Sequence, residues 1–84
     1  MGLIVAAAVL YDGVIFTIPK PARHHNIVHA MFYMGLPKLA QKEQGFILDN
    51  GQYISREDAA TLALANGQVA KLHAPPYLYS EDLW

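Results

Sequence analysis

The sequence contains no cysteine and has few charged residues. Without cysteine there is neither a disulfide framework nor a thiolate zinc site, so a small core must hold the fold alone or be extended by oligomerisation. Charged residues make up 15% of the chain, and the net charge is −1. A protein that binds the backbone of nucleic acids needs a basic face, so we expect no nucleic-acid polymer as a partner.

The chain also lacks a long apolar segment. The apolar run 3–11 is far too short to span a bilayer, and the first ten residues carry no basic region of the kind found in signal peptides. We therefore expect no membrane partner and a cytoplasmic location. The length of 84 residues predicts a single domain, 1–84. Hydrophobic residues make up 54% of it. A domain this small cannot bury so much apolar surface within itself, which indicates a homo-oligomer.

The most clearly patterned stretch begins with a hairpin. Two short apolar runs, 46–49 and 52–54, flank the dipeptide Asn50-Gly51. Asn-Gly is the strongest short signal for a hairpin, because a type I′ turn needs a positive φ angle at both central residues. The sequence therefore predicts two antiparallel strands joined by a two-residue type I′ turn.

A helix is predicted to follow this hairpin directly. Ser55 stands where an N-cap residue is expected, and Asp58 three residues later is an acidic variant of the capping box. From Arg56 the chain is rich in alanine and leucine, and Asn66-Gly67 is a typical C-terminal stop.

The N-terminal part predicts a second hairpin. The apolar run 3–11 and the run 14–18 flank Asp12-Gly13, which favours another type I′ turn. A strand that is apolar on both faces is expected to be buried on both faces. We expect a helix to cover one face of this strand and a second subunit to cover the other.

The remaining segments complete the fold prediction. Apolar residues at helical spacing predict a helix over 22–34, followed by a polar linker over 38–43. Residues 68–84 are expected to form an extended arm, because Pro75-Pro76 excludes a helix there. The predicted order is ββαββα, an α+β domain with a mainly antiparallel sheet, two helices and an extended C-terminal arm.

Four histidines could carry chemistry: His24, His25, His29 and His73. His25 and His29 lie one helical turn apart, which is the spacing of two metal-binding imidazoles. However, Asn26 stands where a zincin has its glutamate, and no carboxylate lies nearby in the sequence. We therefore expect no metal and interpret these histidines as residues of a polar face or an interface. A histidine–metal hydrolase stays as an alternative.

The only two arginines, Arg23 and Arg56, both fall in the first turn of a predicted helix, where the helix dipole disfavours a cation. Free backbone N–H groups joined by a guanidinium make a good site for a phosphate or pyrophosphate. The alternative is that Arg56 pairs with Glu81 or Asp82 of the arm.

Aromatic residues could stack a nucleobase beside such a phosphate site. A two-residue turn would put Phe46 and Tyr53 on the same face of the hairpin, next to Arg56. The sequence contains no nucleophile–base pairing, glycine-rich phosphate loop or acid dyad. We therefore expect no catalytic residue, no cofactor and no enzymatic activity.

Three segments of the chain resemble a known group of proteins: RHHNIVHAM, QGFILDNGQYISREDAATLALANGQ and LYSEDLW. They are similar to small phage and prophage proteins that include the first-described Thoeris anti-defence sponges, and the match covers nearly the whole chain. The resemblance implies a homo-oligomeric protein of the host cytoplasm that is not an enzyme. It would sequester the immune signal glycocyclic ADP-ribose, and some such proteins also hold cyclic oligonucleotides of the kind used in CBASS defence.

The resemblance also implies a set of motif residues, without saying which of them touch a ligand and which build the fold. They are Arg23, His24, Gln44, Gly45, Phe46, Arg56, Gln68 and residues 80–84. Combined with the aromatic residues, this gives the expected ligand-binding set: Arg23, His24, Gln44, Phe46, Tyr53, Arg56, Gln68 and Tyr79. The main alternative is a protein that inhibits a host defence enzyme by binding to it through its apolar surface.

Overall fold

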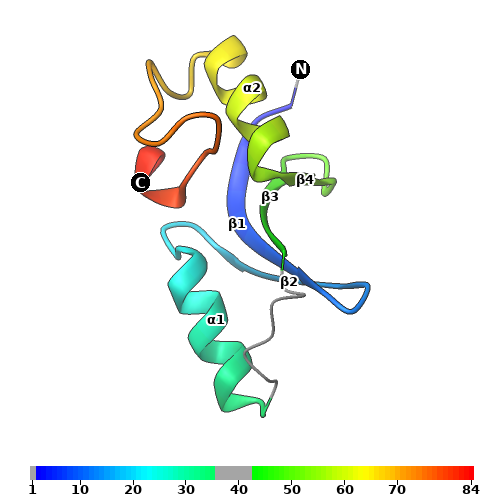
Figure 1. The fold of residues 1–84 in the computed structure, drawn as a ribbon. Coiled ribbons are helices and arrows are strands. Elements are labelled where there is room, and N and C mark those ends of the chain that lie inside the picture. The colour runs from blue at the N-terminus through cyan, green and yellow to red at the C-terminus, as the bar shows by residue number, and fades with distance from the viewer. Residues whose placement is uncertain (1, 36–42) are drawn as a thin grey trace.

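The computed structural model describes residues 2–35 and 43–84. Its elements, in chain order, are β1 (Ile4–Tyr11), β2 (Val14–Pro19), α1 (His24–Tyr33), β3 (Glu43–Leu48), β4 (Tyr53–Ser55), α2 (Arg56–Asn66) and the short 3₁₀ helix η1 (Ser80–Asp82). The four strands form one antiparallel sheet in the order β2-β1-β3-β4 (Figure 1). The predicted α+β fold and its ββαββα order are confirmed. Apart from Glu43, which begins β3, the predicted polar linker lies outside the described residues.

Both helices pack against one face of the sheet. That face presents Ala7 and Val9 of the central strand β1, together with Phe46 of β3. They share one buried cluster with residues of both helices and of the arm, namely Ile27, Met31, Ala59, Ala60, Ala63 and Leu78. On the other face of β1, Ala6 and Ala8 are also buried. Within the described residues, no helix is both long enough and apolar enough to cross a membrane.

The turn between β1 and β2 is of type I′, as the sequence predicts. Asp12 has φ 51° and Gly13 has φ 75°. Tyr11 and Val14 therefore close the hairpin directly opposite each other.

The turn between β3 and β4 contains three residues rather than two. The N–H of Leu48 donates to the carbonyl of Gln52 at 2.9 Å, and the N–H of Gly51 donates to the carbonyl of Leu48 at 2.9 Å. Only Gly51 in this loop has a positive φ, of 88°. The side-chain oxygen of Asn50 accepts from the N–H of Gln52 at 2.9 Å, a local bond that favours an ordinary turn conformation at asparagine. The type I′ prediction for this turn was wrong.

The third loop residue changes which side chains share a face. Phe46 pairs with Ile54, and Ile47 pairs with Tyr53. Because side chains alternate along a strand, a shift of one residue moves each of them to the other face. Phe46 and Tyr53 therefore lie on opposite faces of the sheet, and the prediction of a shared face was wrong.

The helix boundaries follow the local signals closely. Ser55 caps α2, and its hydroxyl oxygen accepts from the N–H of Asp58 at 3.2 Å. Gly67 ends this helix with φ 81°. The first helix, α1, begins later than the predicted range 22–34, because Arg23 has an extended backbone and serves as its N-cap.

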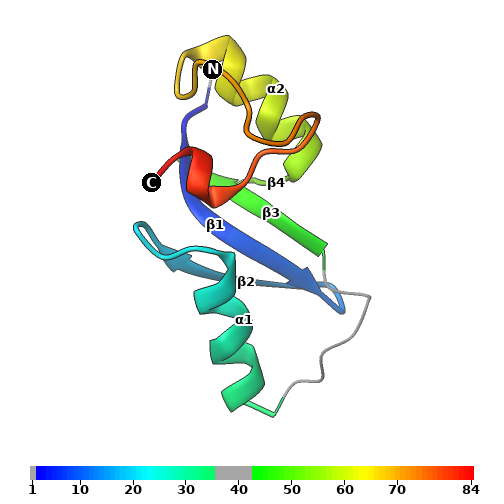
Figure 2. The same cartoon turned by 60° about the vertical axis from the view of Figure 1, so that its left-hand side comes forward.

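The C-terminal arm folds back onto the domain, and Figures 1 and 2 show η1 between α2 and the start of α1. Leu78 and Ser80 are completely buried. The N–H of Leu78 donates to the carbonyl of Arg56 at 3.2 Å. The indole N–H of Trp84 donates to the carbonyl of Ala22 at 3.0 Å. The arm thereby brings aromatic residues beside the first residue of α2.

Candidate ligand-binding site

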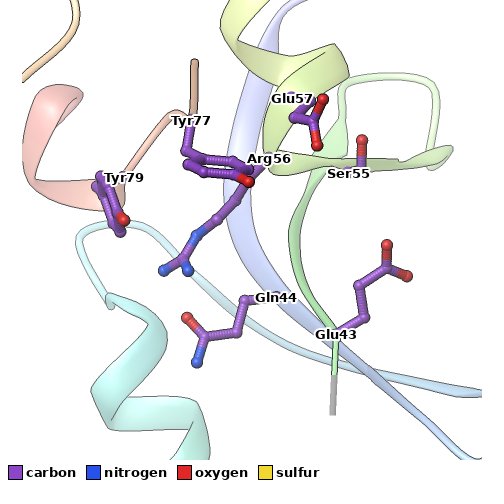
Figure 3. Close-up of a pocket in the computed structure, with 7 residues that line it drawn as sticks. All are labelled: Glu43, Gln44, Ser55, Arg56, Glu57, Tyr77 and Tyr79. Atoms are coloured by element: carbon purple, nitrogen blue, oxygen red, sulfur yellow. The ribbon is translucent and has the colours of Figure 1, made fainter. Parts of the chain in front are cut away.

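Arg56, the first residue of α2, is held by an aromatic ring. Its guanidinium carbon lies 4.4 Å from the centre of the Tyr79 ring, a cation–π contact. Figure 3 shows the side chain extending between Tyr79 and Gln44. The Nε atom is buried and has no hydrogen-bond partner. A positioned cation with an unused N–H is well suited to bind an anion.

The expected alternative, an ion pair between Arg56 and the acidic arm, is replaced by this stacking. The carboxylate of Asp82 instead accepts from the backbone N–H groups of His73 at 3.2 Å and Tyr79 at 3.0 Å. Burial lowers the pKa of Arg56, and the nearby charge of Glu81 partly opposes this shift. Arg56 thus contacts the arm through the Tyr79 ring, and the N–H groups of its guanidinium are available to other partners.

Two neighbouring pockets meet at Arg56 and Gln44. The carboxylate-side pocket has a volume of about 230 Å³ and is lined by Glu43, Gln44, Ser55, Arg56, Glu57, Tyr77 and Tyr79 (Figure 3). The histidine-side pocket has a volume of about 390 Å³ and is lined by His24, His25, Val28, His29, Gln44, Arg56 and Glu81. Small-molecule sites commonly occupy about 300–1,000 Å³, so the two pockets together are large enough for a nucleotide.

His24 lines the histidine-side pocket with an unsatisfied acceptor. Its side chain is 5% exposed, and its ring packs edge-to-face on Phe46 with centroids 5.0 Å apart. Its Nε2 lies 2.7 Å from the carbonyl oxygen of Gly45, so Nε2 must carry the proton, because a carbonyl only accepts. Burial lowers the pKa of His24 and favours the neutral ring. Its Nδ1 is then a bare acceptor, and it has no partner.

Tyr53 packs over Gly45. A Cβ atom at Gly45 would lie 2.5 Å from the Tyr53 hydroxyl and would also collide with the carbonyl of Ile54. Burial, reinforced by the charge of Glu43, raises the pKa of Tyr53 to about 12. Its buried hydroxyl lies near the Glu43 carboxylate but makes no hydrogen bond of ordinary geometry. A glycine at position 45 is therefore required for the ring to lie here.

The structure brings four of the expected site residues together: His24, Gln44, Arg56 and Tyr79 line the two pockets. Phe46 is completely buried beneath His24 and belongs to the core. It supports the pocket from below and offers no face for stacking a base.

Two other expected residues have their polar groups engaged in the fold. Arg23 donates through Nε at 2.8 Å, and also through Nη2, to the main-chain oxygen of Trp84. Gln68 accepts from the N–H of Ile4 at 2.8 Å and donates to its carbonyl at 3.0 Å. The hydrogen bonds of Arg23 thereby connect the arm to the start of α1, and those of Gln68 connect the segment after α2 to β1.

The sequence interpretation missed four residues of the carboxylate-side pocket: Glu43, Ser55, Glu57 and Tyr77. The signal that could have found the two glutamates is that each stands next to an expected site residue, Gln44 or Arg56. Nothing in the sequence showed where the arm would place Tyr77. In the part of the chain that the structure describes, no group of three or more histidine, aspartate or glutamate side chains could hold a metal ion.

Comparison with known protein families identifies the chain as a small phage protein, because the profile of one phage family matches it over residues 3–84. The chain belongs to this family, which is described as Phage T4 y16D protein. No curated protein and no solved structure matches it. The expectation of a phage protein, drawn from the resemblance of its motifs, is thus confirmed at the level of the family.

Proposed function

We propose that this protein binds and sequesters a cyclic nucleotide immune signal of the bacterial host, glycocyclic ADP-ribose or a cyclic oligonucleotide, without cleaving it. The observation that carries the proposal is Arg56: its guanidinium is stacked on Tyr79, and its buried Nε–H lacks an acceptor between two adjoining pockets. A phosphate oxygen would satisfy that donor, and a charge-assisted hydrogen bond in a partly buried site is strong.

The protonation state of His24 supports binding rather than hydrolysis. His24 uses its N–H on the carbonyl of Gly45 and is buried beside Phe46, so it is poorly placed to transfer protons to a ligand. A protein of this kind would act in the host cytoplasm. The amount of signal that it removes would be proportional to the number of its copies.

The experiment is a release assay. The purified protein is incubated with a panel of cyclic nucleotides, separated from free ligand, heated, and its supernatant is analysed by chromatography. Sequestration returns the intact nucleotide, whereas a hydrolase returns a product. The Arg56→Ala variant is the matched control and should release much less nucleotide. If no member of the panel is retained by the native protein, the proposal is wrong.

A second candidate function, inhibition of a host defence enzyme by direct binding, is favoured by one surface feature. Phe32, Tyr33 and Met34 are adjacent at the end of α1 and are 59%, 86% and 60% exposed. Large exposed apolar side chains in one patch are typical of protein interfaces. This function predicts that no small ligand is retained in the release assay and that substitution of Tyr33, rather than Arg56, abolishes inhibition of the defence enzyme.

A further inference from the structure

The two pockets beside Arg56 differ in charge. The carboxylate-side pocket has two exposed glutamates, Glu43 and Glu57, in its lining. Figure 3 shows the guanidinium of Arg56 pointing away from both carboxylates and toward the amide of Gln44. A phosphate would therefore meet more repulsion on the carboxylate side, where two glutamates line the pocket, than on the other side of Arg56, where Glu81 is the one carboxylate in the lining.

The histidine-side pocket offers hydrogen-bond donors from α1. His25 and His29 are exposed, their ring centroids lie 6.3 Å apart, and both line the pocket that Arg56 also borders. An imidazole N–H donates to phosphate oxygens whether or not the ring is charged. Glu81 is the carboxylate in this lining, and one of its oxygens accepts from the hydroxyl of Ser80 at 3.2 Å.

An independent observation concerns the buried His24. Its Nδ1 is an acceptor without a partner, and its side chain is 5% exposed in the lining of this same pocket. A buried polar atom left unsatisfied in this way costs free energy. A ribosyl phosphate would satisfy the polar groups of His24, Arg56 and the exposed imidazoles, because its hydroxyl donates to Nδ1 while its phosphate oxygens accept from Arg56 and the imidazoles.

On the carboxylate side, the favoured ligand groups are hydrogen-bond donors. Carboxylates accept from ribose hydroxyls in dinucleotide-binding proteins, and Glu43 and Glu57 are available for the same role. Tyr77 and Tyr79 are aromatic walls of this pocket, against which a base or sugar can pack.

This inference rests on the proposed function. We infer that the bound nucleotide occupies both pockets, one on each side of Arg56, and that it does so in one orientation. Its phosphates with the adjoining ribose lie on the histidine side, and its second nucleoside, rich in hydroxyl and amino donors, lies on the carboxylate side. The site then selects ligands that have a phosphate group between two donor-bearing units, and it discriminates against anions that lack them.

The test compares two probes, cyclic ADP-ribose and inorganic pyrophosphate, by calorimetric titration of the full chain. A His25→Gln/His29→Gln double variant should weaken the binding of both probes about tenfold, as expected for lost charge-assisted hydrogen bonds. Glu57→Gln should weaken cyclic ADP-ribose about tenfold, and it should leave pyrophosphate unchanged or bound more tightly. The matched controls are His73→Gln and Asp58→Asn, because neither residue lines either of the two pockets.

Three results would overturn the orientation. They are equal weakening of both probes by Glu57→Gln, unchanged pyrophosphate binding in the double histidine variant, and no binding of either probe by the native protein. In the last case the proposed function still stands if the release assay recovers another cyclic nucleotide intact. The proposed function is refuted only if the native protein retains none of the cyclic nucleotides in the panel. Circular dichroism of each variant shows whether the fold is kept.

Discussion

Arg56 occupies an unfavourable place for a cation, the first position of a helix. The structure explains how it stays there: the Tyr79 ring supports the guanidinium, and the carbonyl of Arg56 holds Leu78 of the arm. The residue thus combines a backbone role in docking the arm with a side chain whose buried Nε–H is unused. Substitution of the side chain alone separates these two roles, because the backbone bond remains.

For Arg56→Ala we expect ligand binding to weaken by roughly 1.5–3 kcal/mol, the contribution of a hydrogen bond to a charged group. Thermal stability should change little, because loss of the cation–π contact is offset by removal of a cation from a helix N-terminus. Arg56→Lys should restore binding only in part, since an ammonium lacks the planar fork. Melting temperature and nucleotide affinity are measured on the same preparations. A folded Arg56→Ala variant with native affinity would exclude Arg56 from the site.

Gly45→Ala should destabilise the protein, although alanine in a strand is normally preferred over glycine. Gly45 has no positive φ angle, so the penalty comes from crowding: the new Cβ would collide with the carbonyl of Ile54 and the Tyr53 ring. Overpacking of this kind costs about 1–3 kcal/mol. Urea unfolding measures it, and a variant as stable as the native protein would show that Tyr53 moves aside freely.

His24 should make the stability depend on pH below neutrality. Burial lowers its folded-state pKa below the unfolded value of about 6.5. The unfolded chain therefore binds more protons as the pH falls through 6.5, and stability is lost there, whereas above 6.5 the ring is neutral in both states and contributes no slope. Urea unfolding at pH 7.5 and pH 5.5 should show a smaller loss for His24→Gln than for the native protein. Equal losses would assign the pH dependence to other groups.

Two similar dipeptides adopt different turns, which shows that the dipeptide alone does not determine the turn type. Asp12-Gly13 adopts the type I′ turn with both φ angles positive, whereas Asn50-Gly51 belongs to a three-residue loop. In the second case the Asn50 side chain bonds to a backbone N–H two residues later. The strands, helices and caps were predictable because their signals lie within a few residues of one another. The register of the second hairpin was not predictable, because an Asn-Gly dipeptide fits both a two-residue turn and a three-residue loop that ends in glycine.

The candidate site was predictable where sequence neighbours become spatial neighbours. Gly45 pairs with Ser55 across β3 and β4, so Gln44 and Arg56, one residue beyond each partner, necessarily come together. In the sequence, Arg23 and Gln68 could not be distinguished from the pocket residues of the same motif. Membership of a motif does not show whether a residue builds the fold or binds a ligand. Their engagement with Trp84 and Ile4 depends on contacts between distant parts of the chain.

The arm should contribute substantially to stability although it contains only one short 3₁₀ helix. Deletion of residues 79–84 removes Trp84 from its contacts with Ala22 and Arg23, and it also removes the Tyr79 ring. Each large aromatic side chain contributes roughly 1.5–3 kcal/mol by burial, so the melting temperature should fall markedly. Trp84→Ala is the matched variant that keeps Tyr79, and it should lose stability while leaving Arg56 stacked. An unchanged melting temperature after deletion would mean that the arm is not docked in solution.

Several large apolar side chains of the protein lie on its surface and not in its core. In the described residues, exposed apolar side chains include Val14 and Ile15 of the edge strand β2 as well as Phe32, Tyr33 and Met34 of α1 and its C-cap. A net charge of −1 offers little repulsion between copies of the chain. A shared assembly would bury these side chains and allow each copy to present its own pair of pockets.

We therefore expect the protein to be an oligomer of identical chains at micromolar concentration. Light scattering coupled to size-exclusion chromatography should give a mass that is a multiple of the 9.3 kDa chain. Phe32→Ser/Tyr33→Ser should shift the protein toward the monomer, because burial of these side chains is then lost, while Leu64→Ser, at a 45% exposed position of α2, is the matched control. Since neither Phe32 nor Tyr33 lines the pockets beside Arg56, a monomeric variant should still bind nucleotide if each chain holds a complete site. Loss of binding on dissociation would instead mean that neighbouring chains complete the pocket, and a native mass of 9.3 kDa would refute the assembly itself.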